Sequence, residues 1–175
     1  MLRHPRPSAI AFGLLMAAAL LAGCASQTAQ PGGATFILVR HAEKADDGSK
    51  DPPLNAAGST RAHALAADLH DAPVRAAYAT AYRRTQATAA PTANTHSLQV
   101  TTYDANLQAA EFADLLRRTH ADGTVLVVGH SNTIPGIAAA LCQCSVPPMG
   151  DDEFDRRITI RIDAQGHAAL QAGRY

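Results

Sequence analysis

Two histidines of this 175-residue chain directly follow short apolar runs. His41 comes after TFILVR, whose last residue is Arg40, and His130 comes after TVLVVG. Burying a charged side chain costs free energy unless a partner or a ligand compensates it, so this placement indicates a binding function. A neutral imidazole can attack an electrophile, and a guanidinium group binds oxyanions through paired hydrogen bonds. The residue types therefore fit chemistry on an anionic substrate.

The elements that would position these side chains alternate along the chain. Apolar β-like runs lie at 35–40, 74–80, 98–104 and 124–130, and helical patterns separate them at 54–70, 82–94, 105–120 and 132–144. This alternation predicts an α/β fold, a mostly parallel sheet with helices on both faces. Residues 156–175 alternate at period two around DAQG, which predicts a β-hairpin on the sheet edge. Pro91 is expected to end or kink the second helix.

The predicted sheet places both histidines where ligands bind. In open α/β sheets ligands bind outside the carboxyl ends of the strands. Of the eight histidines, only His41 and His130 occupy such strand ends in this pattern. The chain is 47% hydrophobic with a formal net charge of zero, which suits one compact domain. It has no basic run interleaved with aromatic residues, so we expect no nucleic-acid partner.

The first residues have the pattern of an export signal. A short basic segment and an alanine-rich apolar run end in LAGC, which resembles the lipobox of bacterial lipoproteins. This predicts a signal peptide at 1–23, a lipid anchor on Cys24, a flexible tether at 24–34 and one domain at 35–175. Ala25 stands where an Asp would retain such a lipoprotein at the inner membrane, so we expect the periplasmic face of the outer membrane. The alternative is an ordinary signal peptide with a chance cysteine.

Four segments together resemble a known family. RHAEK (40–44), PPLNAAGSTRA (52–62), YATAYRRTQATA (78–89) and VVGHSN (127–132) are similar, in order and spacing, to the motifs of the histidine phosphatase superfamily. The resemblance covers nearly everything from residue 35 to the end, with Ala42 where the family usually has Gly. It implies a phosphoglycerate-mutase-like fold and a site built from Arg40, His41, Arg84 and His130.

The resemblance also implies a mechanism that fits these residue types. Arg40 and Arg84 would bind the phosphate, His41 would be the nucleophile that forms a phosphohistidine, and His130 would donate to the phosphoryl oxygens. The expected substrate is a small phosphate monoester or a phosphoramidate of the phosphohistidine type. No metal and no cofactor are expected. Mutase activity is not expected, because the chain has no large insertion between Arg84 and His130.

The proton donor for the leaving group is missing from its usual place. In the mutase-like branch a Glu follows the third strand, and in this chain Ala109 stands at that position within DANLQA. Glu111, Asp104 and Glu43 remain as candidates, each with the alternative of being a solvated surface acid. The missing acid is also compatible with a phosphoramidate substrate.

Other interpretations predict different sites. A zinc hydrolase could use His41, Glu43 and His130, although the chain has no close pair of metal-ligating histidines. A non-catalytic anion-binding lipoprotein would also fit the altered signature. CQC (142–144) is interpreted as two thiols at a helix end, since a disulfide across one residue closes a strained ring. DDEFDRR (151–157) is interpreted as a charged loop, with a rim over the site as the alternative.

Overall fold

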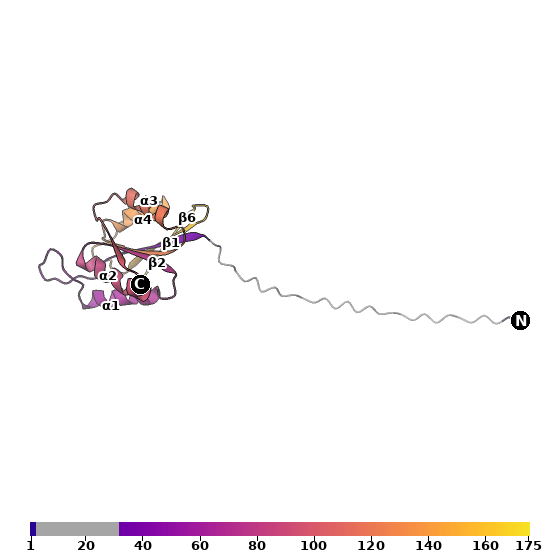
Figure 1. Ribbon diagram of the computed structural model, residues 1–175, viewed down its shortest axis with the longest axis horizontal. Helices are drawn as coiled ribbons and strands as arrows, with labels where there is room; N and C mark the ends of the chain where they lie inside the picture. Colours follow the sequence, from indigo (N-terminus) through magenta and orange to yellow (C-terminus); the bar gives the residue numbers. More distant parts are fainter. Residues whose placement is uncertain (3–31) are drawn as a thin grey trace.

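The computed structural model describes residues 1–2 and 32–175. The elements between Gly33 and Arg174 form a six-stranded sheet with helices on both sides (Figure 1). Residues 3–23 of the predicted signal peptide, Cys24 and most of the predicted tether lie outside the described residues. The first strand begins at Gly33, two residues ahead of the predicted domain start at Thr35. No helix in the described part of the chain has the length and apolar character needed to cross a bilayer.

The secondary structure follows the predicted alternation. The strands are β1 (Gly33–Arg40), β2 (Val74–Thr80), β3 (Val100–Tyr103), β4 (Gly123–Gly129), β5 (Arg156–Asp163) and β6 (Ala168–Arg174). The helices are α1 (Ala56–Asp68), α2 (Arg83–Thr95), α3 (Ala109–Thr119) and α4 (Ile134–Cys142). The strand order is β3-β2-β4-β1-β5-β6, with the first four parallel and the β5–β6 hairpin antiparallel at one edge. The α/β class, the mostly parallel sheet and the edge hairpin are therefore confirmed.

Side chains of the central strands alternate between two hydrophobic cores. Phe36 and Leu38 of β1 face the core beneath α3 and α4, whereas Ile37 and Val39 face the core beneath α1 and α2. The two helix pairs accordingly cover opposite faces of the sheet (Figure 1). Because both faces are covered, the parallel strands read as continuous apolar runs in the sequence.

The register of β1 and β4 brings the two strand-end histidines together. The strands are parallel neighbours, and Arg40 pairs with Gly129 at their carboxyl ends. The next residue of each strand is therefore a histidine at the same level of the sheet. The backbone N–H of His41 donates to the Gly129 carbonyl at 2.9 Å, which continues the pairing by one more bond.

Pro91 does not end the second helix. α2 continues past this residue to Thr95, with Pro91 inside it. Proline removes one backbone hydrogen bond from a helix interior. Buried Ala89 and Ala93 on either side of Pro91 pack against the core beneath α1 and α2, and this packing holds both turns in place.

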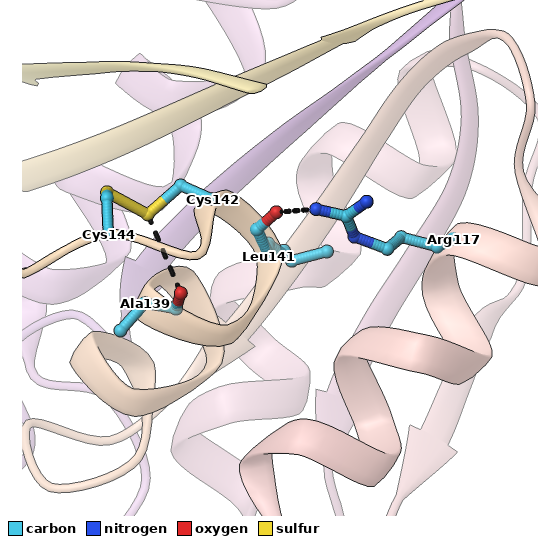
Figure 2. Close-up of a disulfide and its surroundings, with 5 residues drawn as sticks. All are labelled: Arg117, Ala139, Leu141, Cys142 and Cys144. Carbon is cyan, nitrogen blue, oxygen red and sulfur yellow. Dashed lines mark hydrogen bonds between the residues drawn. A yellow bond between two sulfur atoms is a disulfide. The ribbon is translucent and has the colours of Figure 1, made fainter. Parts of the chain in front are cut away.

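The cysteines at the end of α4 differ from the sequence-based expectation. Cys142 and Cys144 form a disulfide, so the prediction of two free thiols is wrong, although they do lie at a helix end (Figure 2). Gln143 between them adopts a left-handed conformation with φ of 52°, which turns the chain back so that the two side chains face each other. Arg117 of α3 donates to the neighbouring Leu141 carbonyl and fixes the same helix end.

Candidate active site

His41 is buried directly after β1 with its ring orientation fixed. Only 4% of the residue is exposed, and Nδ1 lies 2.8 Å from the carbonyl oxygen of Ala42. A carbonyl can only accept a hydrogen bond, so Nδ1 carries the proton. The lone pair of Nε2 is left free, which is the tautomer that a nucleophilic histidine requires.

The segment that follows His41 is held by α2 and α1. The N–H of buried Ala42 donates to Thr88 Oγ1 at 3.0 Å, and that hydroxyl donates to the Arg84 carbonyl at 2.8 Å. On the other side, a Cβ placed on Gly58 of α1 would lie 2.1 Å from the Glu43 carbonyl oxygen. Only glycine permits this close approach, so α1 packs directly against the segment that follows His41.

His130 lies between β4 and α4 and faces His41. Its carbonyl accepts from the N–H groups of Thr133 and Ile134, which begin the helix. The two imidazole rings are 5.4 Å apart between centroids, in an edge-to-face arrangement. Nε2 of His130 lies 3.0 Å from Thr80 Oγ1 at the end of β2.

Both predicted arginines lie beside these rings with unused donors. Arg40 is 7% exposed, its Nη1 donates to the carbonyls of Gly150 and Asp151, and the Phe154 ring covers its Cζ at 4.2 Å. Arg84 lies against the ring of Tyr82, with Cζ 4.4 Å from the centroid. The Nε atoms of both arginines are buried and have no hydrogen-bond partner within the described structure. Unpaired buried donors of this kind cost free energy until an acceptor binds.

A cavity of about 350 Å³ opens beside the histidines. It is lined by His41, Tyr82, Arg84, Ala105, Asn106, His130, Ser131, Asn132 and Thr133. Arg40 is not among the lining residues, and its guanidinium contacts the Phe154 ring and the carbonyls of Gly150 and Asp151. Another cavity, of about 400 Å³ near Gly32, is lined mainly by apolar residues and contains none of the predicted site residues.

Burial and the two arginines keep both histidines neutral. Burial, followed by the charges of Arg84 and Arg40, lowers the pKa of His41 to about 4, against the opposing hydrogen bond to Ala42. Burial, followed by the same two arginines, lowers the pKa of His130 to about 4. An ordinary histidine has a pKa of about 6.5. At neutral pH, Nε2 of His41 is therefore available for attack.

The three predicted proton donors lie outside the cavity. Glu43 accepts from Nε and Nη2 of Arg61, the shorter contact being 2.6 Å, and these hydrogen bonds lower its pKa. Glu111 is exposed in the first turn of α3, and Asp104 accepts from the backbone N–H of Asn106 in an adjoining hollow. In the part of the chain that the structure describes, no carboxylate lines the cavity between the histidines.

The zinc hypothesis requires a ligand set that is not assembled. His41 and His130 face each other, but the Glu43 carboxylate is bound to Arg61. Among residues 1–2 and 32–175, no three His, Cys, Asp or Glu side chains are grouped so as to hold a metal ion.

Several residues around the site were not predicted from the sequence. Asp51 accepts from the N–H of Arg83 and lies 3.5 Å from Nη1 of Arg84. Phe154, within the predicted charged loop, covers Arg40, so this loop is also a wall of the site. The strand-end rule that identified His41 and His130 also applies to Thr80, the last residue of β2.

Comparison with known proteins agrees with this geometry. The family model described as the histidine phosphatase superfamily (branch 1) matches residues 36–108, which include Arg40, His41 and Arg84. This segment of the chain therefore matches the histidine phosphatase superfamily. His130 lies beyond the matched residues, and the parallel register of β1 and β4 brings it to the same site. No curated protein matches the chain in a sequence search.

Solved structures of several phosphatases share the fold. The protein histidine phosphatase SixA in complex with tungstate is 19% identical, with a TM-score of 0.64 over 80% of this chain and 96% of that one. A protein assigned as phosphohistidine phosphatase SixA from Nakamurella multipartitia is 27% identical, with a TM-score of 0.61 over 82% and 96%. The phosphoserine phosphatase of Entamoeba histolytica is 16% identical, with a TM-score of 0.62 over 81% and 97%.

Proposed function

We propose that this protein is a phosphatase that hydrolyses a phosphate monoester or a phosphoramidate through a phosphohistidine on His41. The observation that carries the proposal is the free Nε2 of a buried, neutral His41 next to two arginines whose Nε donors have no partner. An anion with several acceptor oxygens would satisfy those donors. The tungstate in the SixA complex, an oxyanion in a protein of the same fold, supports this assignment.

The reaction proceeds in two displacements. Nε2 of His41 attacks phosphorus, a bond from nitrogen to phosphorus forms, and the bond to the leaving group breaks. Arg40 and Arg84 share the charge on the phosphoryl oxygens, which is the main requirement in a loose transition state. Water then attacks the phosphohistidine, which releases phosphate and restores His41.

The absence of a carboxylate in the described cavity wall bears on the substrate. An alkoxide leaving group needs a proton from a positioned acid, and neither Glu43, Glu111 nor Asp104 lines the cavity. Leaving groups that need little protonation, such as phenols, or that carry their own proton, such as the imidazole of phosphohistidine, are favoured. The SixA structures of the same fold are described as histidine phosphatases, which supports the second class.

Turnover should be independent of divalent metal and sensitive to vanadate. We expect hydrolysis of p-nitrophenyl phosphate to survive EDTA, because two guanidinium groups supply the positive charge that magnesium supplies elsewhere. Vanadate should inhibit, because it offers the same oxygens to Arg40 and Arg84. A steady-state assay with and without each reagent checks both. Loss of activity in EDTA, restored by zinc, would support the zinc alternative.

The histidines should titrate well below the ordinary range. The pKa values of His41 and His130 are lowered to about 4, so both rings should remain neutral at pH 5, where most exposed histidines are charged. Proton NMR of the ligand-free protein between pH 3.5 and 8 measures this. Activity should be lost only as the pH falls through about 4, where Nε2 of His41 takes up a proton. Titration of both rings near 6.5 would contradict the buried, cationic site.

An anion-binding protein without turnover is the second candidate. It is favoured by one observation, the departure of the signature at Ala42 and Ala109 from the family pattern. A panel of phosphate esters and phosphoramidates separates the two. Binding of inorganic phosphate with no turnover of any member of the panel would establish the second candidate.

The lipid anchor is part of the same proposal. LAGC at residues 21–24 is followed by Ala25, which favours lipidation of Cys24 and an outer-membrane location facing the periplasm. Acyl chains contribute about 0.8 kcal/mol of membrane affinity per buried methylene, so several chains give stable anchoring. A clickable palmitate analogue should label the wild-type protein and should not label Cys24→Ser. An unlabelled wild-type protein in the soluble periplasmic fraction would contradict the anchor and leave the catalytic proposal intact.

A further inference from the structure

A chain of buried hydroxyl groups leads from His130 into α2. Thr80 and Thr85 are both fully buried. Nε2 of His130 lies 3.0 Å from Thr80 Oγ1, which lies 2.8 Å from Thr85 Oγ1. The Thr85 hydroxyl in turn lies 2.9 Å from the carbonyl oxygen of Thr80 and 2.8 Å from that of Tyr82.

The two carbonyl groups give this chain a direction. Carbonyl oxygens only accept, so the single hydrogen of the Thr85 hydroxyl must point to one of them or be shared between the two. The oxygen of Thr85 then accepts from the Thr80 hydroxyl, and the oxygen of Thr80 accepts from His130. The reverse direction would leave the Thr85 oxygen facing two carbonyl oxygens with no hydrogen between them. Both carbonyls also accept from other donors, the Thr80 oxygen from Gln86 Nε2 at 2.8 Å and the Tyr82 oxygen from the Gln86 N–H at 3.0 Å, so neither would lack a partner. The first direction prevails because oxygens 2.8–2.9 Å apart repel each other unless a hydrogen lies between them.

We infer that Thr80 and Thr85 are positioning residues that fix His130 in the tautomer protonated at Nε2, with Nδ1 as its only basic nitrogen. Within the described structure Nδ1 makes no hydrogen bond, and the His130 ring lines the cavity. Two threonines of β2 and α2 therefore determine which nitrogen of His130 exchanges protons. The geometric assignment stands alone, and its consequence for catalysis rests on the proposed phosphatase function.

The fixed tautomer gives His130 a defined role at a cavity without a lining carboxylate. The pKa of His130 is low in the ligand-free protein, but a bound phosphate raises it, because a negative charge beside an imidazole favours the imidazolium. A phosphate monoester that arrives as the monoanion then passes its proton to Nδ1, which leaves a dianion beside an imidazolium. When His41 attacks, the Nδ1–H bond breaks and the proton goes to the departing group, so His130 returns to neutral. In the second step Nδ1 takes one proton from the attacking water while the other stays on the phosphate. Nδ1 then returns its proton to a phosphate oxygen, so phosphate leaves as the monoanion and His130 is neutral again. Every proton transfer of the cycle is then accounted for without Glu43, Glu111 or Asp104.

The tautomer can be read directly in the resting protein. In protein labelled with ¹⁵N-histidine, NMR at pH 7 should show Nε2 of His130 as the protonated nitrogen and Nδ1 as the unprotonated one, with the signals assigned by their loss in His130→Gln. The wild-type spectrum alone overturns the inference if Nδ1 is the protonated nitrogen. Because no substrate is present, this readout is separate from the phosphatase proposal. If the protein shows the expected tautomer but no turnover, the positioning role of Thr80 and Thr85 is supported and the proposed phosphatase function is rejected.

Variants of Thr85 distinguish the positioning of His130 by Thr80 and Thr85 from a purely structural role of these residues. Thr85→Val keeps the shape but removes the hydroxyl, which frees Thr80 to donate to Nε2. We expect a mixed or reversed tautomer and a loss of kcat of roughly ten- to a hundredfold, with little change in KM. Thr85→Ser restores the hydroxyl and should restore both the spectrum and kcat. A Thr85→Val protein with the wild-type tautomer would overturn the inference, as would a Thr85→Ser protein that behaves like Thr85→Val.

Discussion

Replacement of His41 by alanine should abolish turnover of p-nitrophenyl phosphate. His41 is the buried ring whose Nδ1 is fixed on the Ala42 carbonyl and whose Nε2 is free beside Arg84. Without it no phosphoryl-enzyme can form, and removal of a nucleophile of this kind costs at least about 10⁴-fold in kcat. Steady-state kinetics of the purified variant, with circular dichroism to confirm folding, measure the effect.

His63→Ala is the matched control for this variant. His63 is exposed on α1 and hydrogen-bonds to the Ser59 carbonyl in the preceding turn, remote from the cavity lining. It should keep wild-type activity. A His41→Ala protein that retains more than a few per cent of wild-type turnover would show that another group is the nucleophile.

Arg84→Lys should cause the next largest loss. The change keeps the positive charge but removes the planar fork, whose Nε is now buried without a partner and available to a phosphoryl oxygen. We expect kcat/KM to fall by about 100-fold, which corresponds to about 2.7 kcal/mol of transition-state stabilisation. The comparison of kcat/KM for wild type and variant measures this loss.

The adjacent arginine provides the control. Arg83 is exposed, and its side chain is not among those lining the cavity. Its link to Asp51 runs through the backbone N–H, which the substitution Arg83→Lys preserves. This variant should be nearly silent. Equal losses in the two variants would show that the site does not depend on the guanidinium group of Arg84.

The parts of the site that sequence reasoning could reach lie at strand ends. His41 and His130 each follow an apolar run, and parallel strands end at one edge of the sheet, so position in the sequence indicates position in the site. The register confirms this for His41 and His130, because Arg40 pairs with Gly129 and the two histidines are the next residues. The same reasoning, applied to β2, would have found Thr80.

The parts that sequence reasoning missed depend on long-range contacts or on local backbone conformation. Asp51 approaches Arg84, and Phe154 covers Arg40, across large separations in the chain that no local pattern reveals. Glu43 is a candidate acid by its position in the sequence, but its carboxylate forms a salt bridge with Arg61 of α1. The disulfide depends on the left-handed conformation of Gln143, and neither propensity nor spacing predicts such a conformation for glutamine.

Trapping the phosphoryl-enzyme tests the central claim most directly. The protein would be mixed with excess p-nitrophenyl phosphate, quenched within milliseconds in alkaline denaturant, because phosphohistidine is acid-labile, and digested for mass spectrometry. A phosphate on the peptide that carries His41, lost in His41→Ala and after a chase without substrate, is the predicted result. Steady turnover with no phosphate on His41, or with phosphate on another residue, would contradict the account.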